Sequence, residues 1–346
     1  MVGQILIAVF GISLLVIVHE MGHYLVARAF GMRVTRFSIG LGPVLARFQP
    51  RGSQTVFQIC AVPFLAYVMI AGMNPTDEVD PRDPELYANK GVFARMLTIF
   101  AGPFANYLAA SVMVFFVALF AWREDAPTEP MIVDSVDSTS PAAAAGVRVG
   151  DAIVEANGRA IKNVGELIEV TRTRAGKPTV YVIERDHKRL APVTIMPKDA
   201  GGRGVIGVTA RIETRYQPMS LPDAARAAIT FPLALTVLSL EGIADLVRRR
   251  TTEGITGPVG MGKMVAEQAE KGVFEFVRTL IYISVALGLF NLLPIPALDG
   301  GRLVFLGYEM VTRRRANERI EAAVHAFGLL FLLGVITLVT LRDVMG

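Results

Sequence analysis

Three residues near the end of the first apolar segment have the types and spacing of a metal site. The chain reads His19-Glu20-Met21-Gly22-His23, and residues four apart lie on one face of a helix, so both imidazoles can bind one ion. Glu20 then stands beside that ion, where it can act as a general base. The pattern is that of zinc hydrolases, in which neutral histidine nitrogens bind the metal and one position stays open for water. The alternative, two surface histidines and a solvated glutamate, is disfavoured by the uncharged segment before them, because ionisable groups in a membrane are costly unless paired or ligated.

A catalytic zinc needs a third protein ligand, and Asp299 is the best candidate. It lies in segment 291–301, which reads NLLPIPALDGG, and Pro294 and Pro296 must interrupt a regular helix there. A carboxylate in such a break can lie at membrane depth and point inward. Because the chain has a single cysteine, Cys60, a CxxC metal site is excluded. The remaining histidines lack the context of a ligand: His187 and His325.

The elements that carry these residues are predicted to be membrane helices. Of 346 residues, 52% are hydrophobic and 19% are charged, below the roughly 25% charge of an ordinary soluble protein. The first apolar segment has neither a basic leader nor a small-residue cleavage site, so we interpret it as a retained helix rather than a signal peptide. Four segments without Asp, Glu, Lys or Arg are each long enough to span a bilayer, which takes about 20 helical residues: 1–19, 96–122, 279–298 and 322–341.

Arginines predict how the chain crosses the membrane, because basic residues collect in cytoplasmic loops. They are frequent after the first helix, in 28–51, and between the last two helices, in 302–319. Both stretches should be cytoplasmic, which places the polar section 125–216 outside and brings the histidines and Asp299 to a similar depth.

Segment 221–250 allows two interpretations. It has only fourteen consecutive uncharged residues, so we predict an amphipathic helix that lies on the outer leaflet. Its last three residues are arginines, which conflict with that side, and a true span here would reverse the orientation of everything downstream.

The polar section predicts a small α/β module. Strand-like runs at 131–136, 152–156, 179–184 and 193–196 accompany a helix near 164–174, with an Asn-Gly turn after the second run. The section resembles a PDZ domain of the circularly permuted bacterial kind. The residues that match its signature are Ser140, Pro141, Ala142, Ala145, Gly146, Gly150, Asp151, Ile153, Asn157 and Gly158.

Segment 52–76 is uncharged and has the length of a fifth span, but its sequence favours β-structure. Pro63, the Asn74-Pro75 pair and the β-type run 55–62 argue for an extended hairpin rather than a helix. A hairpin at membrane depth requires protein or a water-filled cavity over its backbone, so we predict a membrane-re-entrant hairpin.

Together these expectations define a fold class: a polytopic α-helical membrane protein with four transmembrane helices, an inserted extracytoplasmic α/β PDZ domain and a membrane-re-entrant β-hairpin. The predicted parts are the first transmembrane helix (1–27), the cytoplasmic and re-entrant β region (28–92), the second transmembrane helix (93–123), the PDZ domain (127–213), the amphipathic outer segment (217–272), the third transmembrane segment (276–300), a cytoplasmic loop (301–320) and the fourth transmembrane helix (321–342).

The complete set of motifs resembles the site-2 proteases, which are zinc intramembrane metalloproteases, and especially the bacterial regulator of sigma-E protease branch. Besides the histidine motif, the PDZ signature and segment 291–301, the motifs that carry the resemblance are 37–43, 101–106 and 257–260.

This resemblance implies a role for each candidate residue. It implies Zn²⁺ bound by His19, His23 and Asp299, with Glu20 as the catalytic base. It also implies that the re-entrant strand pairs with the unwound substrate, although this chain has Pro63-Phe-Leu-Ala-Tyr67 where relatives usually carry Pro-Leu-Gly-Gly-Tyr. The residues placed at the substrate are Asn291, which would also hold the developing oxyanion, Pro294, Pro296 and Tyr67.

We therefore expect a zinc-dependent endopeptidase that cuts single-span membrane proteins near the cytoplasmic face of the bacterial plasma (inner) membrane. By resemblance, its substrate is an anti-sigma factor or similar signalling precursor, already shortened outside by a site-1-type protease, in regulated intramembrane proteolysis. Membrane lipid is an expected partner, but nucleic acid is not, because no basic stripe is interleaved with aromatics. The alternative is a catalytically silent PDZ-bearing scaffold, which the intact Glu20 disfavours. A transporter would require repeat symmetry, which we do not find.

Overall fold

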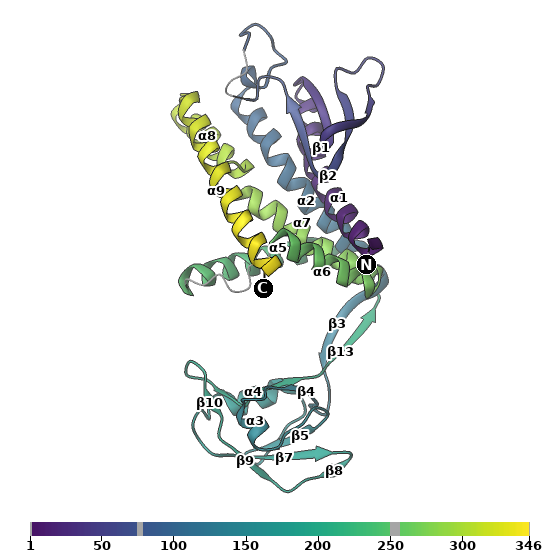
Figure 1. The fold of residues 1–346 in the computed structure, drawn as a ribbon, viewed down its shortest axis with the longest axis vertical. Coiled ribbons are helices and arrows are strands. Elements are labelled where there is room, and N and C mark those ends of the chain that lie inside the picture. The colour runs from purple at the N-terminus through teal and green to yellow at the C-terminus, as the bar shows by residue number, and fades with distance from the viewer. Residues whose placement is uncertain (1, 75–78, 250–256, 346) are drawn as a thin grey trace. The chain divides into compact units, whose positions relative to one another are not determined.

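The computed structural model describes residues 2–74, 79–249 and 257–345. They belong to two compact units, one of residues 1–120 and 219–346 and one of residues 121–218, both drawn in Figure 1. Pro75 and Thr76 of the predicted hairpin segment and Arg250 of the arginine cluster lie outside the described residues.

Helices dominate the first unit. Five of those described are long and apolar enough to cross a membrane: α1, α2, α5, α7 and α9. Large apolar side chains on them are exposed, among them Phe10, Phe120 and Leu330, as expected of surfaces that face lipid. α1, α2, α7 and α9 lie within the four predicted spans, α5 is a fifth candidate, and the count of four spans stays a prediction. The helices are α1 (Val2–Ala29), α2 (Val92–Ala121), α5 (Leu221–Arg249), α6 (Pro258–Glu270), α7 (Val273–Leu292), α8 (Asp299–Thr312) and α9 (Glu318–Met345), with a short 3-10 turn at Tyr87–Asn89.

The third predicted segment, 276–300, is not one continuous element. α7 ends at Leu292, residues 293–298 form a loop, and Asp299 begins α8. The break agrees with the two prolines, which cannot continue the backbone bonding of α7.

Much of the predicted cytoplasmic stretch 301–320 is helical, because α8 continues to Thr312, and its side of the membrane stays a prediction. The sequence after the prolines is amphipathic, and its apolar side packs into the core of the first unit, which stabilises a helix there. The buried residues of that core are Ala27, Met32, Val34, Ile70, Tyr87, Ile99 and Leu306.

Two long strands, β1 (Val34–Phe48) and β2 (Val56–Ile70), form the sheet of the first unit. The extended conformation predicted for 55–62 is confirmed, but the predicted hairpin within 52–76 is wrong, because β2 pairs with the upstream strand β1. Phe37 lies opposite both Phe57 and Val68, so the first half of β1 is flanked by the beginning and the end of β2. Both strands are largely apolar, and pairing between them satisfies the backbone N–H and C=O groups along their edges. The membrane depth of this sheet stays a prediction.

The second unit is a small α/β structure, as the sequence predicts. Its main sheet has the order β6-β5-β7-β8, with β9 also paired to β7, and two further pairs are β12-β4 and β10-β11. The strands are β4 (Val133–Val136), β5 (Ala152–Ala156), β6 (Arg159–Ala160), β7 (Thr179–Arg185), β8 (Lys188–Arg189), β9 (Val193–Ile195), β10 (Lys198–Asp199), β11 (Gly204–Val205) and β12 (Val208–Ala210), and the helices are α3 (Pro141–Ala144) and α4 (Val164–Arg172).

Local signals of the predicted PDZ signature have clear structural roles in this unit. Ser140 caps α3, because its hydroxyl accepts a bond from the Ala143 amide. Asn157 has φ +50° in the turn between β5 and β6. Asp151 is buried and accepts bonds from Arg185 at 2.7 and 2.9 Å. Burial would raise the pKa of Asp151, but the bonds from Arg185 and from the Arg148 amide outweigh it and lower that pKa.

The chain enters and leaves the second unit through a two-stranded ribbon. β3 (Trp122–Pro127) pairs antiparallel with β13 (Ile212–Gln217) over their full length. The second helix was predicted to reach residue 123, but α2 ends at Ala121 because Trp122 already belongs to this ribbon. The unit therefore exceeds the predicted 127–213 by the two strands of its stalk.

Candidate metal centre

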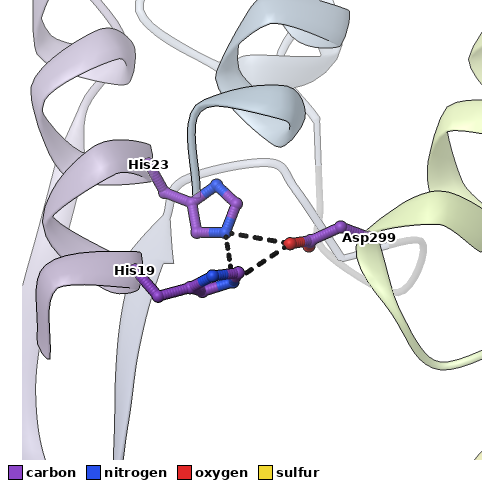
Figure 2. Close-up of side chains that lie close together, drawn as sticks. All are labelled: His19, His23 and Asp299. Carbon is purple, nitrogen blue, oxygen red and sulfur yellow. Dashed lines mark hydrogen bonds and ion pairs between the residues drawn. The ribbon is translucent and has the colours of Figure 1, made fainter. Parts of the chain in front are cut away.

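Two helices bring three potential metal ligands together. His19 and His23 lie one turn apart on α1, and Asp299 is the first residue of α8. Figure 2 shows the three side chains pointing toward one another. His19 Nε2 lies 3.1 Å from Asp299 Oδ2, His23 Nε2 lies 3.3 Å from the same oxygen, and the two Nε2 atoms are 3.3 Å apart. Residues 280 positions apart in the chain thus meet in one cluster.

These three separations fit a tetrahedral zinc site. Zinc binds histidine nitrogen and carboxylate oxygen at about 2.0–2.2 Å, so neighbouring ligand atoms of a tetrahedron are about 3.3–3.5 Å apart. Both histidines are buried, which suits a closed donor set. Within the described ranges, His19, His23 and Asp299 are the one group of three such side chains close enough to hold an ion.

A hydrogen bond determines which nitrogen of His23 faces the cluster. Nδ1 donates to the backbone carbonyl of Thr98 on α2 at 2.8 Å, and because a carbonyl only accepts, Nδ1 carries a proton. In the neutral ring the lone pair is then on Nε2, which faces Asp299 Oδ2. Two acceptors at this distance repel unless a cation lies between them, so the arrangement fits a bound metal ion.

Asn106 on α2 is the corresponding partner of His19. It is fully buried, its side-chain amide lies 3.1 Å from His19 Nδ1, and its Oδ1 has no partner among the described residues. Metal binding through His19 Nε2 requires a proton on Nδ1, and the amide rotamer that directs Oδ1 at Nδ1 accepts that proton. The sequence-based predictions assign no role to Asn106, which entered them only as the last residue of motif 101–106. The polar Asn at the end of that apolar motif was the available signal.

Gly102 leaves the room that the histidines occupy. A Cβ atom at this position on α2 would lie 2.3 Å from His23 Nε2 and 2.8 Å from His19 Nε2. Any side chain here would therefore displace both nitrogens, so the glycine allows α2 to pack directly against the cluster.

A cavity of 820 Å³ opens beside the cluster and contains the predicted base. Glu20 lines it together with the three metal residues and with residues 67–74, the end of β2 and its continuation. The Val68 amide donates to the Glu20 carboxylate, so β2 holds the base next to the metal cluster. A water molecule and an extended peptide can both reach Glu20 through this cavity.

The structure brings only some of the predicted substrate residues to this cavity. Asn291 and Tyr67 line it; the Asn291 amide donates to the Leu287 carbonyl at 2.9 Å, and the Tyr67 hydroxyl accepts from Gln58 at 3.3 Å. In the described part of the chain, Pro294 and Pro296 are not among the residues that line it, because they form the loop behind Asp299.

The other two histidines are not members of the metal group. His187 is exposed in the turn between β7 and β8. His325 on α9 contacts the loop before Asp299 and does not belong to the metal group.

Comparison with known proteins agrees with this donor set. Residues 7–335 match Peptidase family M50. The chain belongs to this family. A relative from Mesorhizobium japonicum, named a candidate zinc metalloprotease, is 34% identical over 99% of this chain and 99% of its own length. The metalloprotease MmpA of Caulobacter vibrioides is 31% identical over 96% of this chain and 94% of its own length.

The family membership confirms the resemblance to site-2 proteases, the protease activity and the zinc cofactor that the sequence predicts. With five helices apolar enough to cross a bilayer, this M50 protein is a multi-pass zinc intramembrane protease. A solved PDZ domain of an SdrC-like protein from Listeria monocytogenes matches 24% of this chain and 87% of that domain at 27% identity, but its TM-score of 0.21 is too low to bear on the fold of the second unit.

Proposed function

We propose that this M50 protein cuts single-span membrane proteins within their bilayer segment, by zinc-assisted attack of water on a peptide bond. The observation that supports this proposal is the convergence of His19, His23 and Asp299 beside Glu20 in one cavity. The cluster lies at the end of α1 and just after α7, two of the apolar helices, so a substrate helix within the bilayer can reach it.

Glu20 is the proton carrier in this proposal. His19, His23 and Asp299 would hold zinc, which when bound would lower the pKa of water to about 7 and polarise the scissile carbonyl. Glu20 accepts the proton of the attacking water and then donates it to the leaving amine. Asn291, on the wall of the same cavity, supplies an amide that can hold the substrate carbonyl as negative charge develops.

Residues 67–74 suit the binding of an unwound substrate. A transmembrane helix resists proteolysis because its carbonyls are bonded within the helix, and an added strand supplies replacement partners. This stretch of β2 and its continuation lines the cavity next to Glu20, so a substrate strand laid along it passes the metal cluster. Tyr67, whose hydroxyl accepts a bond from Gln58, would contact the side chains of that strand.

The sidedness of the protein is part of this proposal and rests on the arginines. By the positive-inside rule, the metal cluster lies near the cytoplasmic face of a bacterial inner membrane and the second unit, a PDZ-type domain, lies outside. Substrates in this arrangement are anti-sigma factors or similar signalling precursors, shortened first by a site-1-type protease in regulated intramembrane proteolysis. Membrane lipid surrounds the helices in this proposal, and nucleic acid is not a proposed partner.

A test compares variants with a tagged single-span substrate expressed in the same cells. Glu20→Gln should retain zinc and lose cleavage, by at least about 100-fold if the base supplies the usual share of the rate. Asp299→Ala should lose both zinc and cleavage, because two ligands hold zinc weakly. His187→Ala, in the second unit, is the matched control and should behave as the wild type. Full cleavage by Glu20→Gln would refute the proposed mechanism and favour the silent scaffold.

A further inference from the structure

Helix α9 contacts the loop that presents Asp299, through two residues on one helix face. The Ala297 amide donates to His325 Nδ1 at 2.9 Å. One turn further along α9, Gly328 is the buried residue of this helix. A Cβ atom at Gly328 would lie 2.3 Å from Pro296 Cβ and 2.8 Å from the Pro296 carbonyl carbon, so α9 touches the loop backbone directly.

The loop requires such support, because its conformation is unfavourable. Ala297 has φ +74°, in the left-handed region that residues other than glycine rarely adopt. It lies two positions before Asp299, so a relaxation of this residue would move the carboxylate. A conformation of this kind persists where surrounding contacts hold it, and the bond from Ala297 to His325 is such a contact.

His325 is suited to this contact by the position of its ring nitrogens. Because Nδ1 accepts the Ala297 amide, the proton of the neutral ring is on Nε2. That Nε2 is buried without a partner among the described residues. An unsatisfied buried donor costs free energy, so the fold keeps this histidine for the bond at Nδ1. The ring also packs against Phe305 of α8, with centroids 5.7 Å apart, and α8 is the helix that Asp299 begins.

Away from the loop, α9 is mostly exposed. Apolar side chains along the helix are exposed, among them Phe327, Leu330 and Leu338. Its other end accepts a bond from the Gly260 amide at Asp343, at 2.8 Å. A lipid-facing helix that touches the loop backbone at one face determines where the loop lies.

We propose that α9 positions the third zinc ligand: His325 and Gly328 hold loop 293–298 so that Asp299 stays at bonding distance from the metal. This inference rests on the proposed metal centre, and it assigns both residues as positioning residues, since neither contacts the metal. It gives His325 a role in the site although, as the sequence analysis expects, this histidine is not a ligand.

The first test exchanges His325 in the full-length protein. In His325→Asn the amide oxygen can replace Nδ1 as acceptor, whereas His325→Phe keeps a ring of similar size without an acceptor. We measure zinc loss to a chelator and the absorption spectrum of the cobalt-substituted protein, which reports the ligand set. His325→Phe should lose metal at least about 10-fold faster than the wild type, the lower limit of the affinity loss seen when groups that hold metal ligands are removed. Its cobalt spectrum should also change, and His325→Asn should restore both.

The second test exchanges two glycines of the same helix. Gly328→Ala should reproduce the faster metal loss, whereas Gly334→Ala is the matched control, because a Cβ at Gly334 meets no atom within 4 Å. Wild-type metal loss and cobalt spectra in both His325→Phe and Gly328→Ala would overturn the inference, and so would equal loss in His325→Phe and His325→Asn.

Failure of the proposed function gives a different result. If Glu20→Gln cleaves normally, the mechanism fails while the metal measurements on α9 remain valid. If Asp299→Ala retains zinc with an unchanged cobalt spectrum, the ligand assignment fails, and the positioning role of α9 is overturned with it.

Discussion

The hydrogen bond between Asn106 and His19 leads to a specific prediction. Its amide is buried against His19 Nδ1 at 3.1 Å, and removal of an outer partner of a metal-binding histidine costs about 10–100-fold in affinity. Asn106→Leu, which keeps the size but not the acceptor, should therefore weaken zinc binding by about that factor. Competition with a chelator of known affinity measures it.

Asn106→Asp is the informative comparison, because a carboxylate accepts the Nδ1 proton and is a common partner of zinc-bound histidine. We expect this variant to bind zinc as well as the wild type. Equal zinc affinity in Asn106→Leu and the wild type would contradict the tautomer that we assign to His19.

Helix α5 is the element whose relation to the membrane matters most for topology. The Met219 amide donates to the Ala118 carbonyl at 2.8 Å, before α5 begins. After α5, the Gly260 amide donates to Asp343 at 2.8 Å. At about 1.5 Å per residue, Ala118 lies roughly 18–30 Å along α2 from the residues of that helix that touch the metal site, and Asp343 lies roughly 22–27 Å along α9 from the residues that touch the loop. Segment 219–260 thus leaves and returns at the same end of the helices, where α1 begins and α9 ends in Figure 1.

These contacts favour the predicted outer-leaflet helix over a fifth span, although α5 has the length and composition to cross. A protein with Cys60 replaced by serine offers a cysteine-free background. Single cysteines at the exposed positions Asp223 and Asp245 should both react with an impermeant reagent added from outside. Reaction of Asp245→Cys only after the inner face is opened would contradict this placement and revive the crossing model.

At the scale of the whole molecule, the second unit is attached through one ribbon. Ile212 pairs with Pro127 and Gln217 with Trp122, so the chain enters and leaves the unit at adjacent points. Replacing residues 128–211 by a two-residue Asn-Gly turn should close the ribbon as a hairpin. The metal ligands all belong to the first unit, so zinc content should be unchanged in this deletion.

The deletion also tests whether the second unit excludes or recruits substrates. If the unit excludes bulky external domains, the deleted protein should cleave an uncut precursor that the wild type leaves intact. Loss of cleavage of an already shortened substrate, with zinc retained, would instead show recruitment. A cavity of 460 Å³ beside α4, lined among others by Leu167, Arg203 and Ile206, would then be the expected binding groove.

The amino-acid sequence alone was sufficient for features that depend on local periodicity. The helix that carries His19 and His23 follows from an uncharged apolar run and a four-residue spacing. The break before Asp299 follows from two prolines, and the strands and turn of the second unit follow from alternation and an Asn-Gly pair. Asp299 was predicted from topology, and the structure places it 3.1 Å from His19.

Other features depend on how distant segments pack, and only the tertiary structure revealed them. β2 pairs with β1 and not with itself, because edge bonds are satisfied by whichever strand lies alongside. The loop predicted after Asp299 is the helix α8, since burial of Leu306 stabilises it. The contacts of Asn106 with His19 and of His325 with Ala297 depend on how each helix is rotated about its axis and shifted along it relative to its neighbours. Those quantities arise from side-chain packing across the whole unit, and no local pattern in the sequence encodes them.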